Sequence, residues 1–412
     1  MSHISKTPVG TIVDIHGDGV WPAMAEEIKN TLLDPYFGVE WKVFDLSLQG
    51  RDKTDDKILA DIEAAMLQYR TAVKGPTITP TEEEAKTFKL KKVYGSPNGA
   101  LRKAINGAAI FRSPIEYKGI KKNIPDMEGV TIARQAVGGI YGAPEFKIEG
   151  KGKIEITFTD EAGNKTTKAE WPVKGPGVGM MTTETDKSIN DYAHATFQYA
   201  IFEKKSVVLS TKHTINKIYD GQFIKIFEKV FAESYADQFK KLGLEFDGRM
   251  LIDTAAAKIP QAKLNNWIVA LKNYDGDVQS DMVAGGHVSL GLMDSSLVSA
   301  DGVMLTDPPH GTAPDLEPAF HKEGKLLANP TAYIFAYANA VRHQATMHNN
   351  TEAASRAEIL KASVIQTIEA GFTTGDLTPK GQKSLTGQEF MAKVREAFEK
   401  GLQSGQGLRA AG

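Results

Sequence analysis

Strand and helix patterns alternate from residue 10 to residue 69, and this order limits the architectures that the chain can adopt. Residues 10–15 have the pattern of a short strand, and Pro22 fits the first position of a helix that ends near residue 33. Residues 41–46 repeat the strand pattern and residues 56–69 the helical one. Alternation of this kind favours parallel strands joined through helices. The sequence therefore predicts an α/β fold.

The composition excludes several classes of function. The chain has 412 residues, enough for a large core and for two or more lobes. Its net charge is −2, so no overall field attracts nucleic acid or an anionic membrane, and an anionic substrate requires local arginines. The chain has no cysteine, which excludes disulfides, thiolate nucleophiles, zinc–cysteine sites and iron–sulfur ligation.

The amino-terminal residues give a prediction about location. They contain no apolar leader segment, and no apolar run in the chain is long enough to span a bilayer. We therefore expect a soluble, cytoplasmic protein that does not bind membranes. A protein of the mitochondrial matrix whose leader has been removed would have the same features.

Three aspartates suggest a cation site. Asp277 and Asp281 are four residues apart, so on a helix both carboxylates lie on one face and require a cation or a proton between them. Asp253 ends the apolar run 250–253, which has the pattern of a strand with a carboxylate at its carboxyl end. Oxygen ligands of this kind suit Mg²⁺ or Mn²⁺. The alternative is an acidic, solvated helix start.

Four short motifs occur in one order: Ser-Pro-Asn-Gly at 96–99, Ser-Thr-Lys at 210–212, Lys-Asn-Tyr-Asp-Gly-Asp-Val-Gln-Ser-Asp at 272–281 and His-Gly-Thr at 310–312. In this the chain resembles the homodimeric isocitrate dehydrogenases of the eukaryotic type, which are metal-dependent β-decarboxylating dehydrogenases. The resemblance implies the isocitrate/isopropylmalate dehydrogenase-like fold, with large and small α/β lobes and a β-rich clasp. It divides the chain into a large domain (1–105 and 287–412), a small domain (106–141 and 187–286) and a clasp (142–186).

The clasp has its own sequence pattern. Residues 153–159 alternate with period two, 161–164 form a turn, and the alternation returns at 165–171. A single hairpin is marginally stable in water, so we expect it to pack on its copy in a second subunit. Further expected elements are strands at 206–210 and 303–306 and helices at 186–204, 220–243, 331–349, 352–369 and 386–401.

The resemblance implies a binding site for the three carboxylates of isocitrate. Arginine pairs with carboxylates through two parallel hydrogen bonds, and serine or asparagine adds neutral ones. The implied substrate-binding residues are Thr79, Ser96, Asn98, Gly99, Arg102, Arg112 and Arg134. After Arg134 the chain departs from the family over residues 135–142, although Tyr141 is kept. The extra polar contacts of that neighbourhood are therefore not expected here.

The catalytic residues implied by the resemblance are Tyr141 and Lys212. Asp277, Asp281 and the partner subunit's Asp253 hold the metal, so the active sites are shared across a homodimer. Lys212, which reaches the neighbouring subunit's site, helps remove the proton of the substrate hydroxyl as hydride leaves for the nicotinamide. Loss of CO₂ follows, and Tyr141 protonates C3 to give 2-oxoglutarate.

The coenzyme site is implied by two loops and two later residues. The implied contacts are Lys74, Thr77, Ile78, Thr79, His310, Gly311, Thr312, Ala313, Pro314, Asp315, Leu316, Asn329 and Asp376. Members of the family usually prefer NADP, whose 2′-phosphate requires a basic residue. This chain has Asp315 and Leu316 where an arginine and a histidine are expected, and Glu84 where another arginine is expected. The sequence therefore predicts NAD, with NADP as the alternative.

Other interpretations stay open. The chain could act on homoisocitrate or isopropylmalate, although the serine, the asparagine and three arginines favour a tricarboxylate. It could also be a non-catalytic, tricarboxylate-binding subunit, although such a subunit would be expected to lose Tyr141, Lys212 or a metal aspartate. No basic stripe, repeat or aromatic platform supports a nucleic-acid partner.

Overall fold

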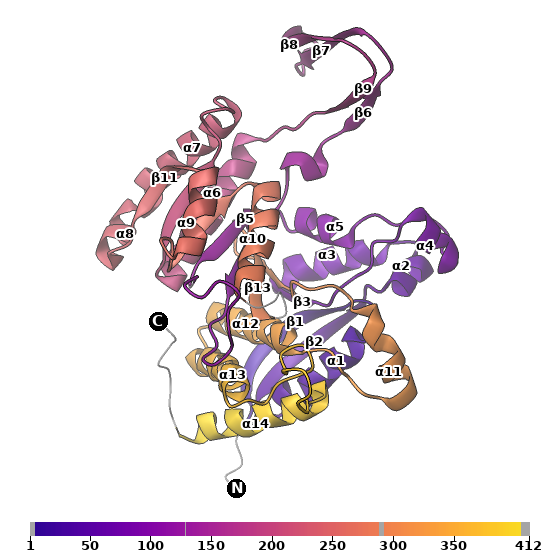
Figure 1. Ribbon diagram of the computed structural model, residues 1–412, viewed down its shortest axis with the longest axis vertical. Helices are drawn as coiled ribbons and strands as arrows, with labels where there is room; N and C mark the ends of the chain where they lie inside the picture. Colours follow the sequence, from indigo (N-terminus) through magenta and orange to yellow (C-terminus); the bar gives the residue numbers. More distant parts are fainter. Residues whose placement is uncertain (1–4, 128, 288–291, 405–412) are drawn as a thin grey trace. The chain divides into compact units, whose positions relative to one another are not determined.

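The computed structural model describes residues 5–127, 129–287 and 292–404. The chain divides into two compact units (Figure 1). The first combines Met1–Val137 with Asp186–Gly412, and the second is Gly138–Thr185. Among the described helices, none is long and apolar enough to cross a membrane. The division into five domain segments predicted from the resemblance stays a prediction.

The first unit contains one sheet to which both predicted lobes contribute. In the described part of the chain it has ten strands, in the order β11-β10-β12-β5-β4-β13-β14-β3-β1-β2. The pairs are parallel except where β4 meets β5 and where β13 meets β4 and β14. The strands are β1 (Thr7–His16), β2 (Phe37–Asp45), β3 (Thr71–Lys74), β4 (Gly107–Pro114), β5 (Thr131–Gln135), β10 (Ser206–Thr211), β11 (Phe246–Leu251), β12 (Trp267–Leu271), β13 (Met293–Ser299) and β14 (Met304–Thr306).

Helices cover both faces of this sheet, as neighbouring residues of β4 demonstrate. The ring of Phe111 stacks on Tyr199 of α6 with centroids 3.8 Å apart, whereas Arg112 bonds to Asp281 of α10. Successive strand residues point to opposite faces, so α6 and α10 lie on opposite faces. The helices are α1 (Trp21–Ile28), α2 (Leu48–Thr54), α3 (Ile58–Tyr69), α4 (Glu82–Thr87), α5 (Pro97–Ala104), α6 (Asp186–Glu203), α7 (Tyr219–Val230), α8 (Ala236–Leu242), α9 (Ile252–Lys258), α10 (Asn273–His287), α11 (Glu317–Glu323), α12 (Thr331–Met347), α13 (Thr351–Glu369) and α14 (Gly387–Gln403).

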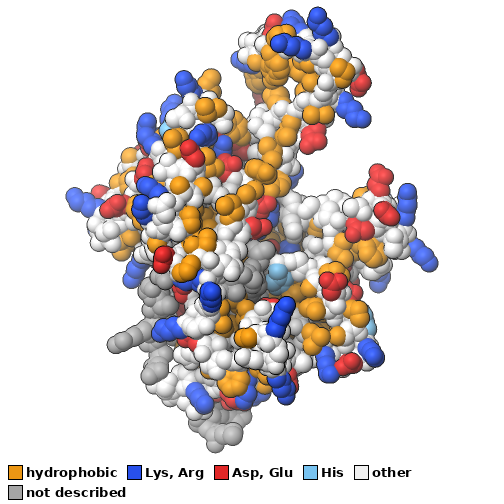
Figure 2. Space-filling model, in the orientation of Figure 1, with side chains coloured by type: hydrophobic (Ala, Val, Ile, Leu, Met, Phe, Trp, Pro, Cys, Tyr) orange, Lys and Arg blue, Asp and Glu red, His pale blue; other side chains and the backbone are white. Residues whose placement is uncertain are grey.

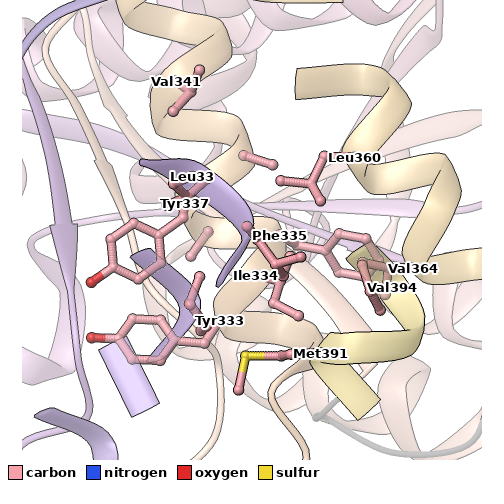
Figure 3. Packing of buried hydrophobic residues seen from close by; sticks show 14 of the residues in the cluster. Leu33, Tyr333, Ile334, Phe335, Tyr337, Val341, Leu360, Val364, Met391 and Val394 are labelled. Carbon is pink, nitrogen blue, oxygen red and sulfur yellow. The ribbon is translucent and has the colours of Figure 1, made fainter. Parts of the chain in front are cut away.

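The largest hydrophobic cluster is built around α12. Its apolar side chains pack against α13 and α14 through Leu360, Val364 and Met391 (Figure 3). The rings of Tyr333 and Tyr337 lie 5.0 Å apart, and their hydroxyl groups point the same way in Figure 3. Since α12 begins two residues after Asn329, a predicted coenzyme contact, this core gives that residue a rigid support.

The second unit contains two antiparallel pairs of strands. Strands β7 (Gly152–Thr159) and β8 (Lys165–Val173) form a hairpin, and β6 (Glu145–Ile148) and β9 (Gly177–Met180), which precede and follow it in the chain, pair with each other. The β7–β8 hairpin lies at the predicted position. Hydrophobic side chains are visible along this unit at the top of Figure 2, and Phe146, Phe158, Trp171, Val178 and Met180 are exposed. Two-stranded sheets are marginally stable alone, and exposed apolar patches often mark interaction surfaces, so packing of this hairpin on a second subunit stays a prediction.

Two sequence-based expectations need correction. The helix expected over 220–243 contains a π-helical turn at Phe231–Tyr235 between α7 and α8, and it ends at Gly243 in the left-handed conformation. Asp253 does not end a strand, because β11 stops at Leu251 and Asp253 lies in the first turn of α9. An aspartate is favourable in the first turn of a helix, because its negative charge lies near the positive end of the helix dipole. Asp253 therefore belongs to α9 and not to the strand that precedes it.

Candidate active site

Helix α10 brings the predicted metal and substrate residues together. Arg134 donates from Nε to Asn273 at 2.9 Å and forms an ion pair with Asp277. Arg112 donates to Asp281 at 3.0 Å and lies 3.7 Å from Asp277. Asp277 and Asp281 therefore lie on one helix face, as predicted, and their oxygens face the same guanidinium. The alternative, an acidic and solvated helix start, is wrong, because α10 begins at Asn273, before both aspartates, and both carboxylates face arginines.

A glycine permits the close contact between α10 and β5. A Cβ atom on Gly276 would lie 2.7 Å from the Cβ of Arg134 and 2.9 Å from its Cα. Contact with backbone at that distance cannot be relieved by rotating a side chain. Gly276 therefore sets the distance at which Arg134 reaches Asp277.

A small cavity adjoins this cluster. Its volume is about 20 Å³, and Lys74, Asn98, Arg102 and Arg112 line it with Ser295 and Asp307. Three of the predicted substrate residues thus meet beside one predicted coenzyme residue. Lys74 is the last residue of β3 and Asp307 follows the adjacent parallel strand β14, which explains why their charged groups are 4.0 Å apart.

The Ser-Pro-Asn-Gly motif begins helix α5. Ser96 is the N-cap, its hydroxyl accepts from the backbone N–H of Gly99, and Pro97 occupies the first turn. The motif therefore fixes the start of the helix that carries Arg102 into the cavity. Ser96 itself is exposed and does not line the cavity.

Lys212 and Asp253 meet in a second cluster. The parallel strands β10 and β11 pair Thr211 with Leu251, so the residues that follow them come close. Nζ of Lys212 lies 2.9 Å from Oδ1 of Asp253, and this hydrogen bond holds the pKa of Asp253 below its usual value. Within one chain, the described residues do not place Asp253 in a metal-ligating group with Asp277 and Asp281.

The loop after β3 is braced by a residue that the sequence reasoning missed. Asp18 is 8% exposed, and its carboxylate accepts from the backbone N–H groups of Leu48 at 2.7 Å and Ile78 at 2.8 Å. Burial raises the pKa of Asp18. The bond to Ile78 holds the segment of Thr77 and Ile78 in place. The next residue, Thr79, is exposed. The sequence could not indicate this role of Asp18, because Leu48 and Ile78, whose N–H groups it accepts from, belong to distant segments of the chain.

The His-Gly-Thr loop lines a cavity of about 540 Å³. The ring of His310 lies on Trp21 with centroids 4.3 Å apart, and Trp21 donates to the carbonyl of Thr312 at 2.9 Å. Burial lowers the pKa of His310. Gly311, Ala313, Leu316, Asn329 and Asp376, all predicted coenzyme contacts, also line this cavity. Trp21 was not predicted, since an aromatic residue at a helix start is usually part of the core.

Two further coenzyme residues bind each other. Asn329 donates from its amide to Asp376 at 2.9 Å, and Thr374 donates to the other oxygen of Asp376 at 2.6 Å. Asp315 and Pro314 lie in the short 3₁₀ turn that follows Ala313, whose φ is +53°. Glu84 has a structural role, because it forms a capping box with Thr81 at the start of α4.

Tyr141 lies in the second unit and is 54% exposed. Its predicted role in the site therefore stays a prediction. A third cluster, Asp14 with His16 and Glu26, is the one group of three possible metal ligands whose ligand atoms lie within 4.8 Å of one another among the described residues. Lys29 donates to Asp14 at 2.6 Å and to Glu26 at 2.7 Å, so an ammonium group already neutralises these carboxylates.

Unpaired polar atoms test whether ligands fit the site. Of the buried side-chain atoms without a hydrogen-bond partner among the described residues, four belong to predicted site residues: Oγ1 of Thr77, Oδ1 of Asn98, Nε of Arg112 and Nε2 of His310. Buried polar groups are nearly always bonded, so such a concentration indicates a ligand site. Asn98 and Arg112 line the small cavity, where a substrate with carboxylate groups fits, and His310 lines the 540 Å³ cavity, where part of a nucleotide coenzyme fits. A divalent cation fits the carboxylates of Asp277 and Asp281, which face one point.

The fold is of the α/β class, and its candidate site combines two arginines that face a pair of carboxylates with a separate cavity lined by predicted coenzyme residues, a set of parts that suits a metal-dependent dehydrogenase. The sequence model of the isocitrate/isopropylmalate dehydrogenase family matches residues 9–394. The chain therefore belongs to the isocitrate/isopropylmalate dehydrogenase family, and the predicted fold class is confirmed.

Its relatives are isocitrate dehydrogenases of eukaryotes, as the four motifs predicted. The chain is 38% identical to the peroxisomal NADP isocitrate dehydrogenase of Candida tropicalis, over 98% of its own length and 100% of that protein. It is 38% identical to the mitochondrial NADP enzyme of Sus scrofa, over 89% of the chain and 87% of that protein. It is 36% identical to the mitochondrial NADP enzyme of Saccharomyces cerevisiae, over 95% and 94%. Each of these three relatives is named as an NADP enzyme.

Proposed function

We propose that the chain catalyses the oxidative decarboxylation of isocitrate to 2-oxoglutarate and CO₂ with a nicotinamide coenzyme. The observation that carries this proposal is the position of Arg112. Its guanidinium contacts Asp281, lies 3.7 Å from Asp277 and lines the cavity of Asn98 and Arg102. One side chain thus connects the predicted metal carboxylates with the predicted substrate pocket.

The chemistry follows from the residues of the two clusters. Arg102, Arg112 and Arg134 bind and orient the substrate carboxylates. Bound Mg²⁺ or Mn²⁺, held by Asp277, Asp281 and the partner subunit's Asp253, would supply positive charge that polarises the substrate oxygens. Lys212 then takes part in removing the hydroxyl proton, and Tyr141 returns a proton to C3 after decarboxylation.

The proposal includes a homodimer. Lys212 and Asp253 bond to each other at 2.9 Å and not to the Asp277–Asp281 pair of their own chain among the described contacts. A second copy that docks on α10 would place its own Lys212 and Asp253 against that pair. The exposed Tyr274, Val278 and Met282 on α10 supply an apolar surface for such a partner.

The substrate specificity rests on polar atoms in the cavity. The buried Nε of Arg112 has no partner among the described residues, and this guanidinium lines the cavity together with Arg102. An N–H donates, so the third carboxylate of isocitrate can accept from it, whereas the alkyl group of isopropylmalate would leave it unpaired, which costs binding energy. Isocitrate is therefore proposed over isopropylmalate, and homoisocitrate, which also has three carboxylates, stays the alternative.

The coenzyme has two candidates. The names of the relatives favour NADP. One observation favours NAD: no lysine or arginine is among the described residues that line the 540 Å³ cavity, and Asp315 lies in the turn beside it. A 2′-phosphate requires a basic partner, whereas a carboxylate accepts hydrogen bonds from the ribose hydroxyls of NAD. Glu84 no longer contributes to this argument, because its carboxylate caps α4.

Location stays the least supported prediction. The relatives compared here are named as peroxisomal or mitochondrial, so their names do not support the cytoplasmic location predicted from the first residues. Fractionation of cells that express the full chain tests this point.

Initial rates with isocitrate and Mn²⁺, at matched NAD and NADP concentrations, test the proposal. Turnover that disappears in Asp281→Asn and persists in Asp237→Asn, an exposed aspartate on α8, supports the assigned metal pair. A preference for either coenzyme by about tenfold, equivalent to about 1.4 kcal/mol, decides between the candidates. Absence of turnover with both coenzymes, together with isocitrate binding, would instead indicate the non-catalytic subunit.

A further inference from the structure

Asp220 is a buried carboxylate that no predicted role uses. It is the second residue of α7 and is 0% exposed. Its Oδ2 accepts from the backbone N–H of Lys212 at 2.8 Å, and its Oδ1 accepts from Nζ of Lys272 at 2.7 Å. A buried charge is retained only where it is paired and bonded, and both oxygens of Asp220 meet that condition.

On one side, Asp220 fixes the segment that carries Lys212. The backbone N–H groups of Ile215 and Asn216 donate to the carbonyl of Lys212, and Asp220 donates from its own N–H to Asn216 at 2.9 Å. The segment between β10 and α7 therefore forms one hydrogen-bonded turn. The side chain of Lys212 leaves this turn and meets Asp253 at 2.9 Å.

On the other side, Asp220 leads to α10. Lys272 directly precedes Asn273, the first residue of α10. Asn273 accepts from Nε of Arg134 at 2.9 Å, and Arg134 forms an ion pair with Asp277. Bonded contacts thus run without a break from the backbone of Lys212 to the residues that bind substrate and metal in this chain.

We propose that Asp220 is a positioning residue that sets Lys212 and couples the two active sites of the dimer. This inference rests on the proposed function, in which Lys212 serves the partner's site while Arg134 and Asp277 serve their own. Asp220 joins these two sets through direct bonds. When substrate and metal bind in one site, the contacts of Arg134 and Asp277 in that chain change. Through Lys272 and Asp220 this change alters the position of Lys212 in the same chain, and that lysine serves the other site of the dimer.

Mixed dimers separate this role from a structural one. Each dimer contains one chain whose own site is inactivated by Asp281→Asn. The active site of the other chain then uses Lys212 from the chain that carries Asp281→Asn. In the first arrangement Asp220→Asn is placed in the chain without Asp281→Asn, so the Lys212 in use comes from a chain with Asp220 intact. In the second arrangement Asp220→Asn is placed in the chain with Asp281→Asn, so the Lys212 in use comes from a chain without Asp220.

We expect kcat to be about tenfold lower in the second arrangement than in the first, with the coenzyme KM unchanged within about twofold. Equal rates in both arrangements, or a lower rate in the first, would overturn the inference. A dimer with Asp281→Asn in one chain and no change at Asp220 calibrates the rate of a single site. Failure of that dimer to oxidise isocitrate contradicts the proposed function instead.

A second measurement does not depend on turnover. Hydrogen exchange of the segment 212–216 should accelerate in Asp220→Asn, because the buried charge that orders it is lost. Asp237→Asn, an exposed first-turn aspartate on α8, is the matched control and should leave the exchange unchanged. Unchanged exchange in Asp220→Asn would remove the positioning role even if catalysis fell.

A paired variant covers the case in which the single change prevents folding. Asp220→Leu with Lys272→Met removes both charges together, which is better tolerated than leaving one buried charge alone. It also removes the acceptor of the Lys212 N–H, so the same loss in the second arrangement is expected. Full activity of this pair in the second arrangement would contradict the proposal.

Discussion

Arg112 and Asp281 are 169 residues apart in the chain, and their side chains are 3.0 Å apart in the fold. The same guanidinium lies 3.7 Å from Asp277. Both carboxylates thus face a cation that belongs to the protein. A divalent metal at this pair must compete with Arg112, whereas a substrate carboxylate that binds Arg112 relieves the competition.

This relationship predicts positive coupling between metal and substrate. We expect Mn²⁺ to bind about tenfold more tightly when isocitrate is present, a coupling of about 1.4 kcal/mol. Titration of Mn²⁺ by electron paramagnetic resonance, with and without isocitrate and without coenzyme, measures it. The reverse titration must give the same factor, since coupling is reciprocal. Equal Mn²⁺ affinity in both conditions would show that Arg112 does not oppose the metal.

The sequence predicted the Asp277–Asp281 pair because a spacing of four is local information. It could not predict that Arg112 lies against that pair in this structure, because the contact depends on how β4 packs against α10. Gly276, which allows the close approach of Arg134, also has no local signal. Motifs supplied the candidate site residues, and tertiary packing decides which of them touch.

Gly17 gives a second prediction, on the coenzyme loop. A Cβ atom there would lie 1.8 Å from the carbonyl oxygen of Pro76, which is backbone and cannot rotate away. In Gly17→Ala the loop of Thr77 and Ile78 must move, and we expect the coenzyme KM to rise about tenfold with isocitrate binding less affected. Steady-state kinetics with each substrate varied separately test this.

The matched control for this change is Gly150→Ala. A Cβ atom at Gly150 meets no atom within 4 Å, so the coenzyme KM should stay at the wild-type value. A wild-type KM in Gly17→Ala would mean that the loop tolerates displacement.

Buried carboxylates account for most of what the sequence reasoning missed. Asp18 and Asp220 are buried, and each accepts two hydrogen bonds, at least one of them from a group distant in sequence. In the sequence each is an ordinary aspartate beside a glycine. Their roles depend on which strand ends are neighbours, and the strand order was not derivable from the alternation of elements.

The exposed apolar residues of α10 give a third prediction. Tyr274, Val278 and Met282 recur every four residues and are 51%, 44% and 62% exposed. If a second copy covers them, Val278→Lys with Met282→Lys should convert a dimer to a monomer, because two buried unpaired charges oppose association. Activity should fall with the dimer, since Lys212 then reaches no partner. Sedimentation equilibrium measures the mass.

Leu67→Lys on α3 is the control for this surface. Leu67 is 45% exposed, similar to Val278, and lies on a helix that packs on β1. It should leave both the mass and the rate unchanged. A dimer that survives the changes on α10 would place the interface on another surface, such as the exposed strand pairs of the second unit.

His343 on α12 gives a prediction for the dependence of stability on pH. Its Nδ1 lies 2.7 Å from the hydroxyl of Thr71, and burial lowers its pKa from 6.5 to about 4. Between these values the unfolded chain holds a proton that the folded chain does not, so stability rises with pH across this window. The contribution is complete above pH 6.5 and is lost as the pH falls toward 4.

From His343 alone, the free energy of unfolding should fall by about 2 kcal/mol between pH 7 and pH 5. His343→Asn keeps a polar atom near the hydroxyl of Thr71 and cannot titrate, so its loss over the same interval should be smaller by that amount. Urea unfolding of both proteins at the two pH values measures the difference. An equal loss in both would mean that His343 is protonated in the folded chain at pH 5, and that its burial does not exclude the charge.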